Sequence, residues 1–144
     1  MICDLTGMEI ANASLLDEPT AAAEAMMLAK RQSKSKANLF IVDEQCLPQT
    51  INVLETRAKP LGIEIKISDP QKMQDEEYFA ALVQYPGVDG VIRDFSDLVA
   101  SSHKNEALVI FAADILALTL IKPPGEFGAD IVIGSSQRFG VPIG

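Results

Sequence analysis

The residues best placed to do chemistry stand near the end of the sequence, where a short apolar run gives way to polar side chains. Ile131–Ile133 is followed by a glycine and two serines, and then by Gln137 and Arg138. A β-branched run that ends in small and polar residues is typical of a buried strand, and open α/β sheets bind ligands at the carboxyl ends of such strands. The closing stretch Gly128–Gly144 is therefore the first candidate for a binding site.

Other acidic and basic side chains give weaker indications of a site. Asp17 and Glu18 open a predicted helix, where acidic residues are ordinary helix-start chemistry. Asp114 interrupts an apolar segment, so it is either a ligand group or a cap or buried hydrogen-bonded acid. The only histidine, His103, lies near a predicted helix end, and we expect it to be solvated. A hydrolase triad would need this histidine and is disfavoured.

Composition and missing motifs exclude several classes of function. The sequence has no GxGxxG, GxxxxGK[ST] or GxSxG motif. The net charge of −8 makes nucleic acid and anionic membranes poor partners. Cys3 and Cys46 have no spacing suited to a metal site, and we expect reduced thiols. We see no signal peptide, and the longest apolar run, Ala107–Ile121, is too short to span a bilayer, so we expect a cytosolic protein.

Strand and helix patterns alternate along the chain and predict how these residues are positioned. Apolar or alternating runs predict strands, and proline or acidic starts predict helices. The alternation indicates βαβ units, so we predict an α/β fold with a mainly parallel sheet and helices on both faces. A hydrophobic content of 48% fits such a sheet, or a piece of a larger assembly. The predicted strands are 38–42, 63–67 (near a sheet edge), 78–84, 107–112 and 130–133, and the predicted helices are 17–31, 48–59 and 96–103.

The remaining segments are predicted with less regular structure. We expect residues 1–16 to be irregular and residues 69–77 to form a loop or a single helical turn. Ser96 is the predicted N-cap of the third helix. Residues 115–121 fit a strand or a helix equally well by periodicity, so that choice stays open.

Four long strings carry a resemblance to a known family: Ala13–Met26 (ASLLDEPTAAAEAM), Tyr85–Gly90 (YPGVDG), Ala112–Ala117 (AADILA) and Gly128–Gly144 (GADIVIGSSQRFGVPIG). With these strings in the same order, the chain resembles the glycine-cleavage P-protein (decarboxylating glycine dehydrogenase), a family of fold-type I pyridoxal-phosphate (PLP) enzymes, from Leu5 to Gly144. The resemblance implies the large domain of such an enzyme. It also implies a family that decarboxylates glycine on PLP and passes the aminomethyl group to a lipoyl carrier protein.

The resemblance is to the half of the P-protein that lacks the cofactor. P-proteins consist of two homologous halves or two subunits, and only the C-terminal half or its counterpart carries PLP. Gln137 stands where the family has its Schiff-base lysine, and an amide cannot form a Schiff base. The PLP phosphate would lie at the start of the first long helix. There Leu15 and Leu16 crowd the approach, and Asp17 and Glu18 repel an anion.

The same resemblance implies that two further positions of the PLP site hold residues other than those that contact PLP in the family. The aspartate that pairs with the pyridine nitrogen aligns with Phe111, while Asp114 lies a little further on. The position of the ring-stacking histidine aligns with Leu47. We therefore predict no catalytic, cofactor-binding or metal-binding residue in this chain, with PLP held by the partner half or subunit.

Three hypotheses about function stay open. The first is a segment of a glycine decarboxylase, with residues 1–144 forming one α/β domain that is part of a larger PLP-type domain. The family pattern continues past Gly144, so we expect a fragment that is inactive alone. Its partners would be the PLP-bearing half, the lipoyl carrier protein through the full enzyme, and further copies of itself. The second is a non-enzymatic α/β interaction module, and the third is a truncated product without independent activity.

Overall fold

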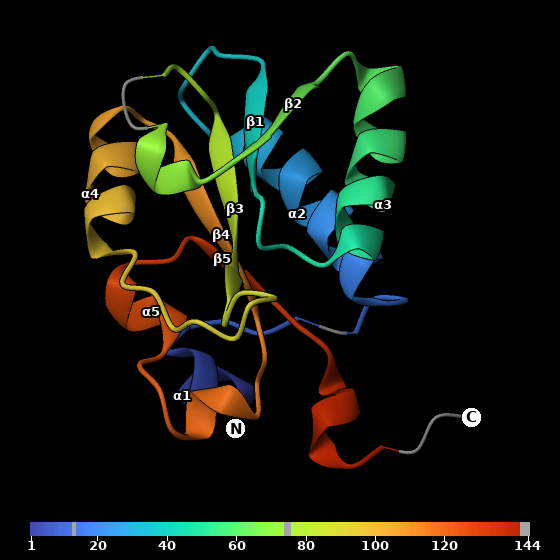
Figure 1. Ribbon diagram of the computed structural model, residues 1–144, viewed down its shortest axis with the longest axis vertical. Coiled ribbons are helices and arrows are strands. Elements are labelled where there is room, and N and C mark those ends of the chain that lie inside the picture. Colours follow the sequence, from blue (N-terminus) through green and yellow to red (C-terminus); the bar gives the residue numbers. More distant parts are fainter. Residues whose placement is uncertain (13, 74–75, 142–144) are drawn as a thin grey trace.

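The centre of the molecule is a five-stranded sheet whose neighbouring strands are all parallel (Figure 1). The computed structural model describes residues 1–12, 14–73 and 76–141. The strand order is β2-β1-β3-β4-β5, which confirms the predicted α/β class and the edge position of the second strand. The strands are β1 Leu39–Asp43, β2 Glu64–Ser68, β3 Ala80–Tyr85, β4 Leu108–Ala113 and β5 Ile131–Ile133.

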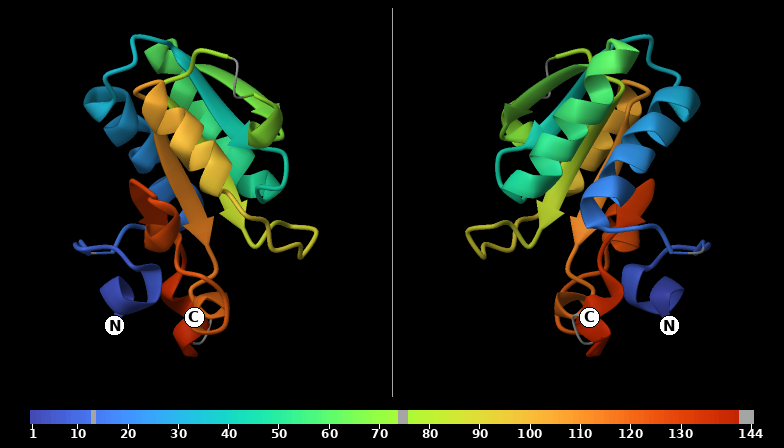
Figure 2. Two further views of the ribbon diagram at one scale, coloured as in Figure 1. Left: turned by 90° about the vertical axis from the view of Figure 1, so that its left-hand side faces the viewer. Right: turned by 90° about the vertical axis from the view of Figure 1, so that its right-hand side faces the viewer.

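Helices cover both faces of the sheet, as predicted (Figure 1 and Figure 2). Helices α2 (Glu18–Gln32) and α3 (Pro48–Ala58) lie on one face. Helices α4 (Ser96–Lys104) and α5 (Pro124–Phe127) lie on the other. Short 3-10 helices complete the chain: η1 Lys59–Leu61, η2 Pro70–Lys72, η3 Ala117–Thr119 and η4 Ser136–Phe139.

The sheet separates two apolar cores, because successive side chains of a strand point to opposite faces. Phe40 and Leu82 pack with the buried alanines of α2 and with Leu54 of α3. Val83 packs on the opposite face with Leu98 of α4. All six residues of the central strand β3 are buried. This burial explains the continuous apolar runs in the sequence, since both faces of a parallel sheet are covered.

Helix α2 begins and ends where its sequence indicates. Its N-cap is Asp17, whose Oδ1 accepts a hydrogen bond of 2.7 Å from the backbone N–H of Thr20. Lys30 and Arg31 lie in the last turn, where cations favour the helix dipole. The Lys30 ammonium also donates to the carbonyl oxygen of Ala37 at 2.7 Å, so the helix end is joined to the segment that leads into β1.

The prediction of an irregular start is wrong for the first residues. Ile2–Thr6 form helix α1, which ends at Gly7 with a left-handed φ of 70°. The N-terminal amine also forms an ion pair with the Asp4 carboxylate at 2.7 Å. A helix of five residues is too short to show the 3.6-residue periodicity that identifies longer helices.

The structure corrects one predicted helix cap and assigns the segment that was left open. The N-cap of α4 is Phe95 rather than Ser96, and the Ser96 N–H donates to the Asp94 carboxylate at 2.8 Å. The open segment 115–121 contains the 3-10 helix η3 instead of a strand or an α-helix. His103 lies in the last turn of α4 and is exposed, as expected, but its Nε2 lies 2.9 Å from the Asp130 carboxylate.

Some predictions concern residues that lie outside the described ranges. These are residue 13 of the first string, residues 74–75 of the predicted loop 69–77, and residues 142–144 of the closing string. In the ranges that the structure describes, no helix has the length and apolar character needed to cross a membrane. Both cysteines are free thiols, with Cys3 half-buried and Cys46 buried.

Candidate functional site

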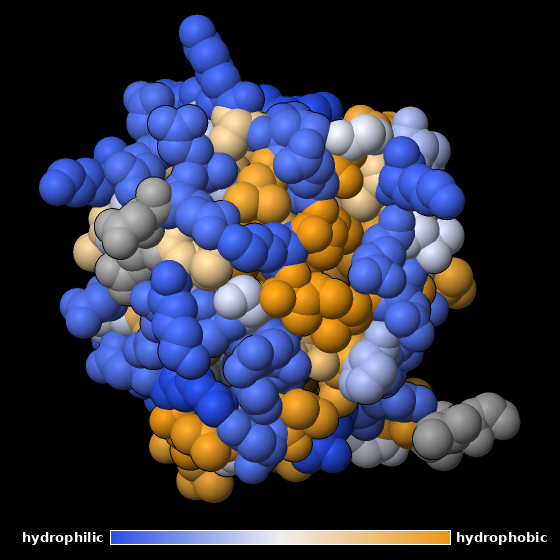
Figure 3. Space-filling model, turned by 45° about the horizontal axis from the view of Figure 1, so that its top comes forward, coloured by the Kyte–Doolittle hydropathy of each residue, from blue (hydrophilic) through white to orange (hydrophobic). Residues whose placement is uncertain are grey.

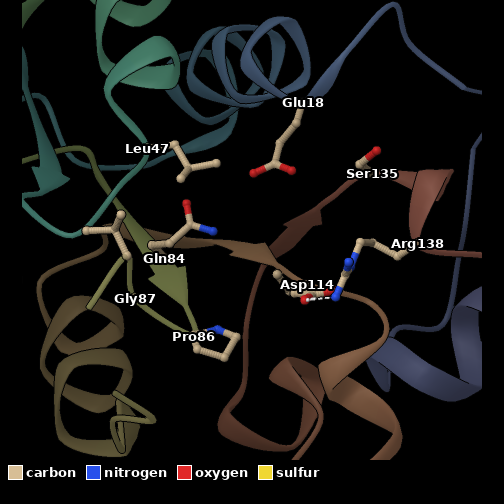
Figure 4. A pocket seen from close by; sticks show the side chains of 10 residues that line it. Glu18, Leu47, Gln84, Pro86, Gly87, Asp114, Ser135 and Arg138 are labelled. Carbon is tan, nitrogen blue, oxygen red and sulfur yellow. Dashed lines mark hydrogen bonds and ion pairs between the residues drawn. The ribbon is translucent and has the colours of Figure 1, made fainter. Parts of the chain in front are cut away.

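A cleft lies at the carboxyl edge of the sheet, where ligands bind in open α/β folds. It consists of two adjoining cavities of about 300 Å³ and about 430 Å³. Glu18, Leu47 and Ser135 line both cavities, so we call the two together the carboxyl-edge cleft. Its walls come from the starts of α2 and α3, the ends of β3 and β4, and the segment around η4 (Figure 4).

The start of α2 gives the cleft two neighbouring carboxylates whose pKa values are shifted in opposite directions. Hydrogen bonds from Thr20 hold the pKa of Asp17 below its usual range. Burial raises the pKa of Glu18, and the nearby charge of Asp114 raises it further, while a hydrogen bond from the Gln84 amide acts in the opposite direction. The cleft therefore favours a neutral Glu18 more than water does, although Asp17 stays ionised beside it.

An ion pair closes the far side of the cleft (Figure 4). Arg138 donates from Nε and Nη2 to the two carboxylate oxygens of Asp114, at 3.0 and 3.1 Å. Partial burial acts to raise the pKa of Asp114, but the hydrogen bonds from Arg138 and from the Leu116 backbone outweigh it and lower the pKa. Asp114 thus accepts hydrogen bonds from both the Arg138 side chain and the Leu116 backbone N–H.

The floor of the cleft holds a buried amide from the end of β3. Gln84 is 7% exposed, and its backbone N–H donates to the Asp43 carboxylate at 3.3 Å. Figure 4 shows its side chain pointing into the cavity, between Leu47 and the Glu18 carboxylate. The side-chain oxygen of Gln84 has no hydrogen-bond partner among the described residues.

A glycine brings the closing segment to the cleft. A Cβ at Gly134 would lie 2.4 Å from the carbonyl oxygen of Ala113, so a side chain there would collide with backbone. The close approach directs the chain from β5 past the end of β4, and Ser135 then caps η4 by accepting from the Gln137 N–H at 3.3 Å. This path places Ser135 and Gln137 in the wall of the cleft.

The structure brings most of the singled-out residues together. Five residues from distant parts of the sequence line the cleft: Asp17, Glu18, Leu47, Asp114 and Gln137. Leu16 also lines it, whereas Leu15 does not. Phe111 lies elsewhere, because it is fully buried on the α4 side of the sheet, where its ring stacks against Phe127.

Sequence reasoning missed two parts of the cleft. Gln84 gave no signal, because a glutamine at the end of an apolar strand resembles any residue at a strand boundary. Arg138 stood out beside Gln137, but its pairing with Asp114 joins residues 24 positions apart and needs the sheet order to be known. Polar residues that follow the ends of strands were the only available signal.

Comparison with known proteins decides the family. The profile of the glycine cleavage system P-protein matches residues 1–144. The chain belongs to the glycine cleavage system P-protein family. This confirms the family that the four sequence strings indicated.

Curated relatives of this P-protein chain are much longer than the chain itself. It is 59% identical over 144 residues to a glycine dehydrogenase (decarboxylating) of Cereibacter sphaeroides. It is 60% identical over 145 residues to the protein of the same name from Nostoc. In both comparisons all of this chain is covered, but it spans only 15% of the relative.

Solved structures support the same fold for the P-protein chain. An inhibitor-bound glycine decarboxylase (P-protein) matches with a TM-score of 0.89 and 33% identity, over 99% of this chain and 34% of that one. Cystathionine γ-lyase of Lactobacillus plantarum matches with a TM-score of 0.76 and 17% identity, over 93% of this chain and 35% of that one. The second likeness shows a shared fold only, that of fold-type I PLP enzymes.

The residues of the cleft do not fit PLP in this P-protein chain. No lysine is among the described residues that line the two cavities, so nothing there could form a Schiff base. At the start of α2, the Thr20 N–H is already bound by the Asp17 carboxylate. A phosphate at that position would meet Asp17 and the nearby carboxylate of Glu18 instead of free N–H donors.

Proposed function

We propose that this chain is a scaffold segment of a glycine decarboxylase, from the half of the P-protein that does not carry the Schiff-base lysine. The observation that carries this proposal is the lining of the carboxyl-edge cleft, which includes Gln137 and two acidic residues at the start of α2. A cleft at this position in the family's fold, with no lysine among its described lining residues, is what a cofactor-free half should contain. The degenerate site positions Asp17, Glu18, Leu47, Phe111, Asp114 and Gln137 then have structural roles only.

The whole protein would carry out the chemistry that its relatives' name describes. Relatives are named glycine dehydrogenase (decarboxylating). In our proposal, PLP bound to the partner half supports decarboxylation of glycine, and the aminomethyl group passes to a lipoyl carrier protein in the cytoplasm. This chain contributes the fold and an interface with that partner half. It binds no cofactor and performs no covalent step by itself.

Exposed apolar side chains support the role in association. Leu16 and Leu120 are 86% and 91% exposed, which leaves both leucines almost fully in water. Figure 3 shows apolar side chains gathered in a strip that is bordered by hydrophilic ones. Contiguous apolar surface on soluble proteins marks contact sites. We propose that residues 1–144 form one part of a larger PLP-type domain whose remainder, with the PLP-bearing half, covers these side chains.

A reconstitution experiment tests this function. The chain is mixed with a separately expressed PLP-bearing P-protein subunit, and light scattering and glycine-dependent CO2 exchange are measured. We expect the mixture to form a complex, and exchange to be higher in the complex than in the subunit alone. A monomer that ignores the subunit and leaves exchange unchanged would contradict the proposal, and would favour the interaction module with no metabolic role.

A further inference from the structure

The loop that follows β3 contains the only aspartate–glycine pair in the sequence. Asp89 precedes Gly90, and no other glycine of the chain follows an aspartate or an asparagine. Both residues are exposed, in a loop of residues 86–94 that projects beyond the end of β3 (Figure 2). Because glycine has no Cβ, its backbone nitrogen is sterically open to the preceding side chain. The pair is therefore a place where a carboxyl group can react with the backbone.

A hydrogen bond folds the Asp89 carboxyl back over the peptide group of Gly90. Asp89 Oδ1 accepts from the Val91 N–H at 3.0 Å. The ring that this hydrogen bond closes contains the Gly90 nitrogen, so the carboxyl stays close to that nitrogen. The geometry thus brings together the two groups that an intramolecular acylation would join.

A guanidinium holds the same carboxyl in its ionised form. Arg93 donates from Nη1 to Asp89 Oδ1 at 3.0 Å, and from Nη2 to Oδ2. These hydrogen bonds, and then the one from the Val91 N–H, lower the pKa of Asp89 from 3.8 to about 2. The same pair raises the pKa of Arg93, and the charges of Asp43 and Asp69 raise it further. The cation is therefore permanent, and the neutral acid form of Asp89 is scarce.

The backbone of the loop is shaped to hold this ion pair. A Cβ at Gly87 would lie 2.8 Å from both Arg93 Nη1 and Asp89 Oδ1, so a side chain there would displace the pair. The Gly90 N–H donates to the Gly87 carbonyl oxygen at 2.8 Å. That hydrogen bond restrains the nitrogen as a nucleophile, since attack requires loss of its proton. One restraint thus acts on the carboxyl and another on the nitrogen.

We propose that Asp89 is a site of spontaneous isomerisation through a succinimide, which the Arg93 guanidinium suppresses while the chain is folded. The Gly90 nitrogen attacks Cγ of the neutral carboxyl, and its proton leaves with the carboxyl hydroxyl as water. Water then opens the five-membered ring. Cleavage between the nitrogen and Cγ restores aspartate, whereas cleavage between the nitrogen and the main-chain carbonyl carbon of Asp89 gives isoaspartate. This inference goes beyond the function proposed above and does not depend on it.

Isomerisation would change the wall of the carboxyl-edge cleft. Isoaspartate adds one methylene group to the main chain and carries the former main-chain carbonyl carbon as its free carboxylate. The bidentate pair with Arg93 is lost, because the carboxylate no longer stands on the same side chain. Gly87 and Val88 come from this loop and line the cleft. Arg93 is therefore a positioning residue that protects the shape of the loop.

Oxygen-18 incorporation tests the proposal. The whole chain is incubated in H2¹⁸O at mildly acidic pH, folded and in urea, and the peptide that contains residues 89 and 90 is analysed by mass spectrometry. Each succinimide that opens adds one ¹⁸O atom, and chromatography separates isoaspartate from aspartate.

The folded chain should react more slowly than the unfolded chain. Because one pKa unit changes the neutral fraction tenfold, we expect ¹⁸O uptake at Asp89 to be at least about tenfold slower in the folded chain. Asp94 and Asp97 precede bulky side chains and are internal controls, which should take up little ¹⁸O in either state. Equal rates at Asp89 in the folded and unfolded chains would overturn the proposal.

Matched arginine variants separate the guanidinium from the fold. Arg93→Met should raise the rate at Asp89 at least about fivefold in the folded chain, whereas Arg31→Met, in the last turn of α2, should leave it unchanged. In Arg93→Met the Asp89 carboxyl, followed by ¹³C NMR, should also titrate closer to its ordinary pKa of 3.8. An unchanged rate or an unchanged titration would refute the proposal.

A glycine variant keeps the test decisive if Arg93→Met does not fold. Gly87→Ala displaces the ion pair but retains the guanidinium, and it should accelerate the same reaction. Circular dichroism shows whether each variant is folded at the temperature of the incubation. A folded Gly87→Ala chain that isomerises no faster than the wild type would contradict the protective role of the pair.

Discussion

Arg138 holds Asp114 with two parallel hydrogen bonds, and this pair joins the end of β4 to the 3-10 helix η4. The two residues come from segments that the sheet places side by side only after β4 and β5 have paired. The carboxylate at this strand end is thereby engaged by an internal cation. The pair therefore fixes the wall of the cleft instead of leaving a charge free for a ligand.

Removing this ion pair should loosen the closing segment without unfolding the domain. In Arg138→Met we expect faster amide hydrogen exchange at residues 135–139 and little change in Tm, because both side chains of the pair are partly exposed to water. Arg31→Met, in the last turn of α2, is the matched control and should leave that exchange unchanged. A global loss of protection in Arg138→Met would show that the pair supports more than η4.

The same pair should make the closing segment sensitive to acid. The pKa of Asp114 is lower in the folded chain than its ordinary value of 3.8. The contribution of this carboxylate to stability is therefore complete above about pH 3.8, and is lost as the pH falls through the lower folded pKa. We expect protection of residues 135–139 in hydrogen exchange to fall in that window for the wild type. Asp114→Asn should have weaker protection that no longer responds to the same change of pH.

The stability that the Asp17 cap gives to α2 should depend more on its side-chain oxygen than on its negative charge. Asp17→Ala removes the acceptor for the Thr20 N–H, so we expect a clear decrease in Tm. Asp17→Asn keeps an acceptor oxygen and should recover most of that decrease. Thermal unfolding followed by circular dichroism measures both. If the two variants unfold at the same temperature, the charge and not the cap stabilises the helix.

Glu18 should lower stability when it ionises. Its pKa is raised above the ordinary value of 4.5 by burial, and then by the charge of Asp114. Between the two values the folded state holds a proton that the unfolded state has released, so stability falls as the pH rises through that window. Glu18→Gln should flatten this decrease in urea unfolding measured from pH 4 to pH 7. Parallel pH profiles for the variant and the wild type would contradict the raised pKa.

Phe111 should act as a core residue, so that polar or smaller side chains at this position lower the stability of the domain. It is fully buried, with its ring edge-on to Tyr85 and Phe95 and stacked on Phe127. We expect Phe111→Ala to cost about 3–5 kcal/mol in the free energy of unfolding. Phe111→Leu keeps most of the volume and should cost much less. Phe111→Asp should unfold the domain, because its charge would be buried without a partner. Urea unfolding that is unchanged in Phe111→Ala would refute this role.

Much of the fold followed from local patterns in the sequence. The five strands and three longest helices were predicted because each has an apolar run, an alternating run or a marked start, such as Asp17 before α2. Helix α1 was missed because five residues leave no periodic signal. The N-cap of α4 was misplaced by one residue, since Asp94 binds the same first turn through its side chain.

The cleft could be predicted only in outline. Parallel topology implies that the ends of β3 and β4 meet, so a site at the carboxyl edge was expected, and Gln137 was placed there. The orphan oxygen of Gln84 depends on burial from several elements at once and has no local signal. Phe111 lies outside the cleft, on the α4 side of the sheet, and the side of the sheet that a strand residue faces depends on the packing of the whole domain.

The central claim is that this member of the P-protein family provides a PLP-type scaffold without holding PLP. The most direct measurement is to incubate the chain with PLP, reduce it with borohydride and map lysine adducts by mass spectrometry, in the folded and in the urea-unfolded chain. We predict only scattered, substoichiometric adducts on exposed lysines in both states. A single lysine modified to near one equivalent in the folded chain, and not in the unfolded chain, would contradict the account.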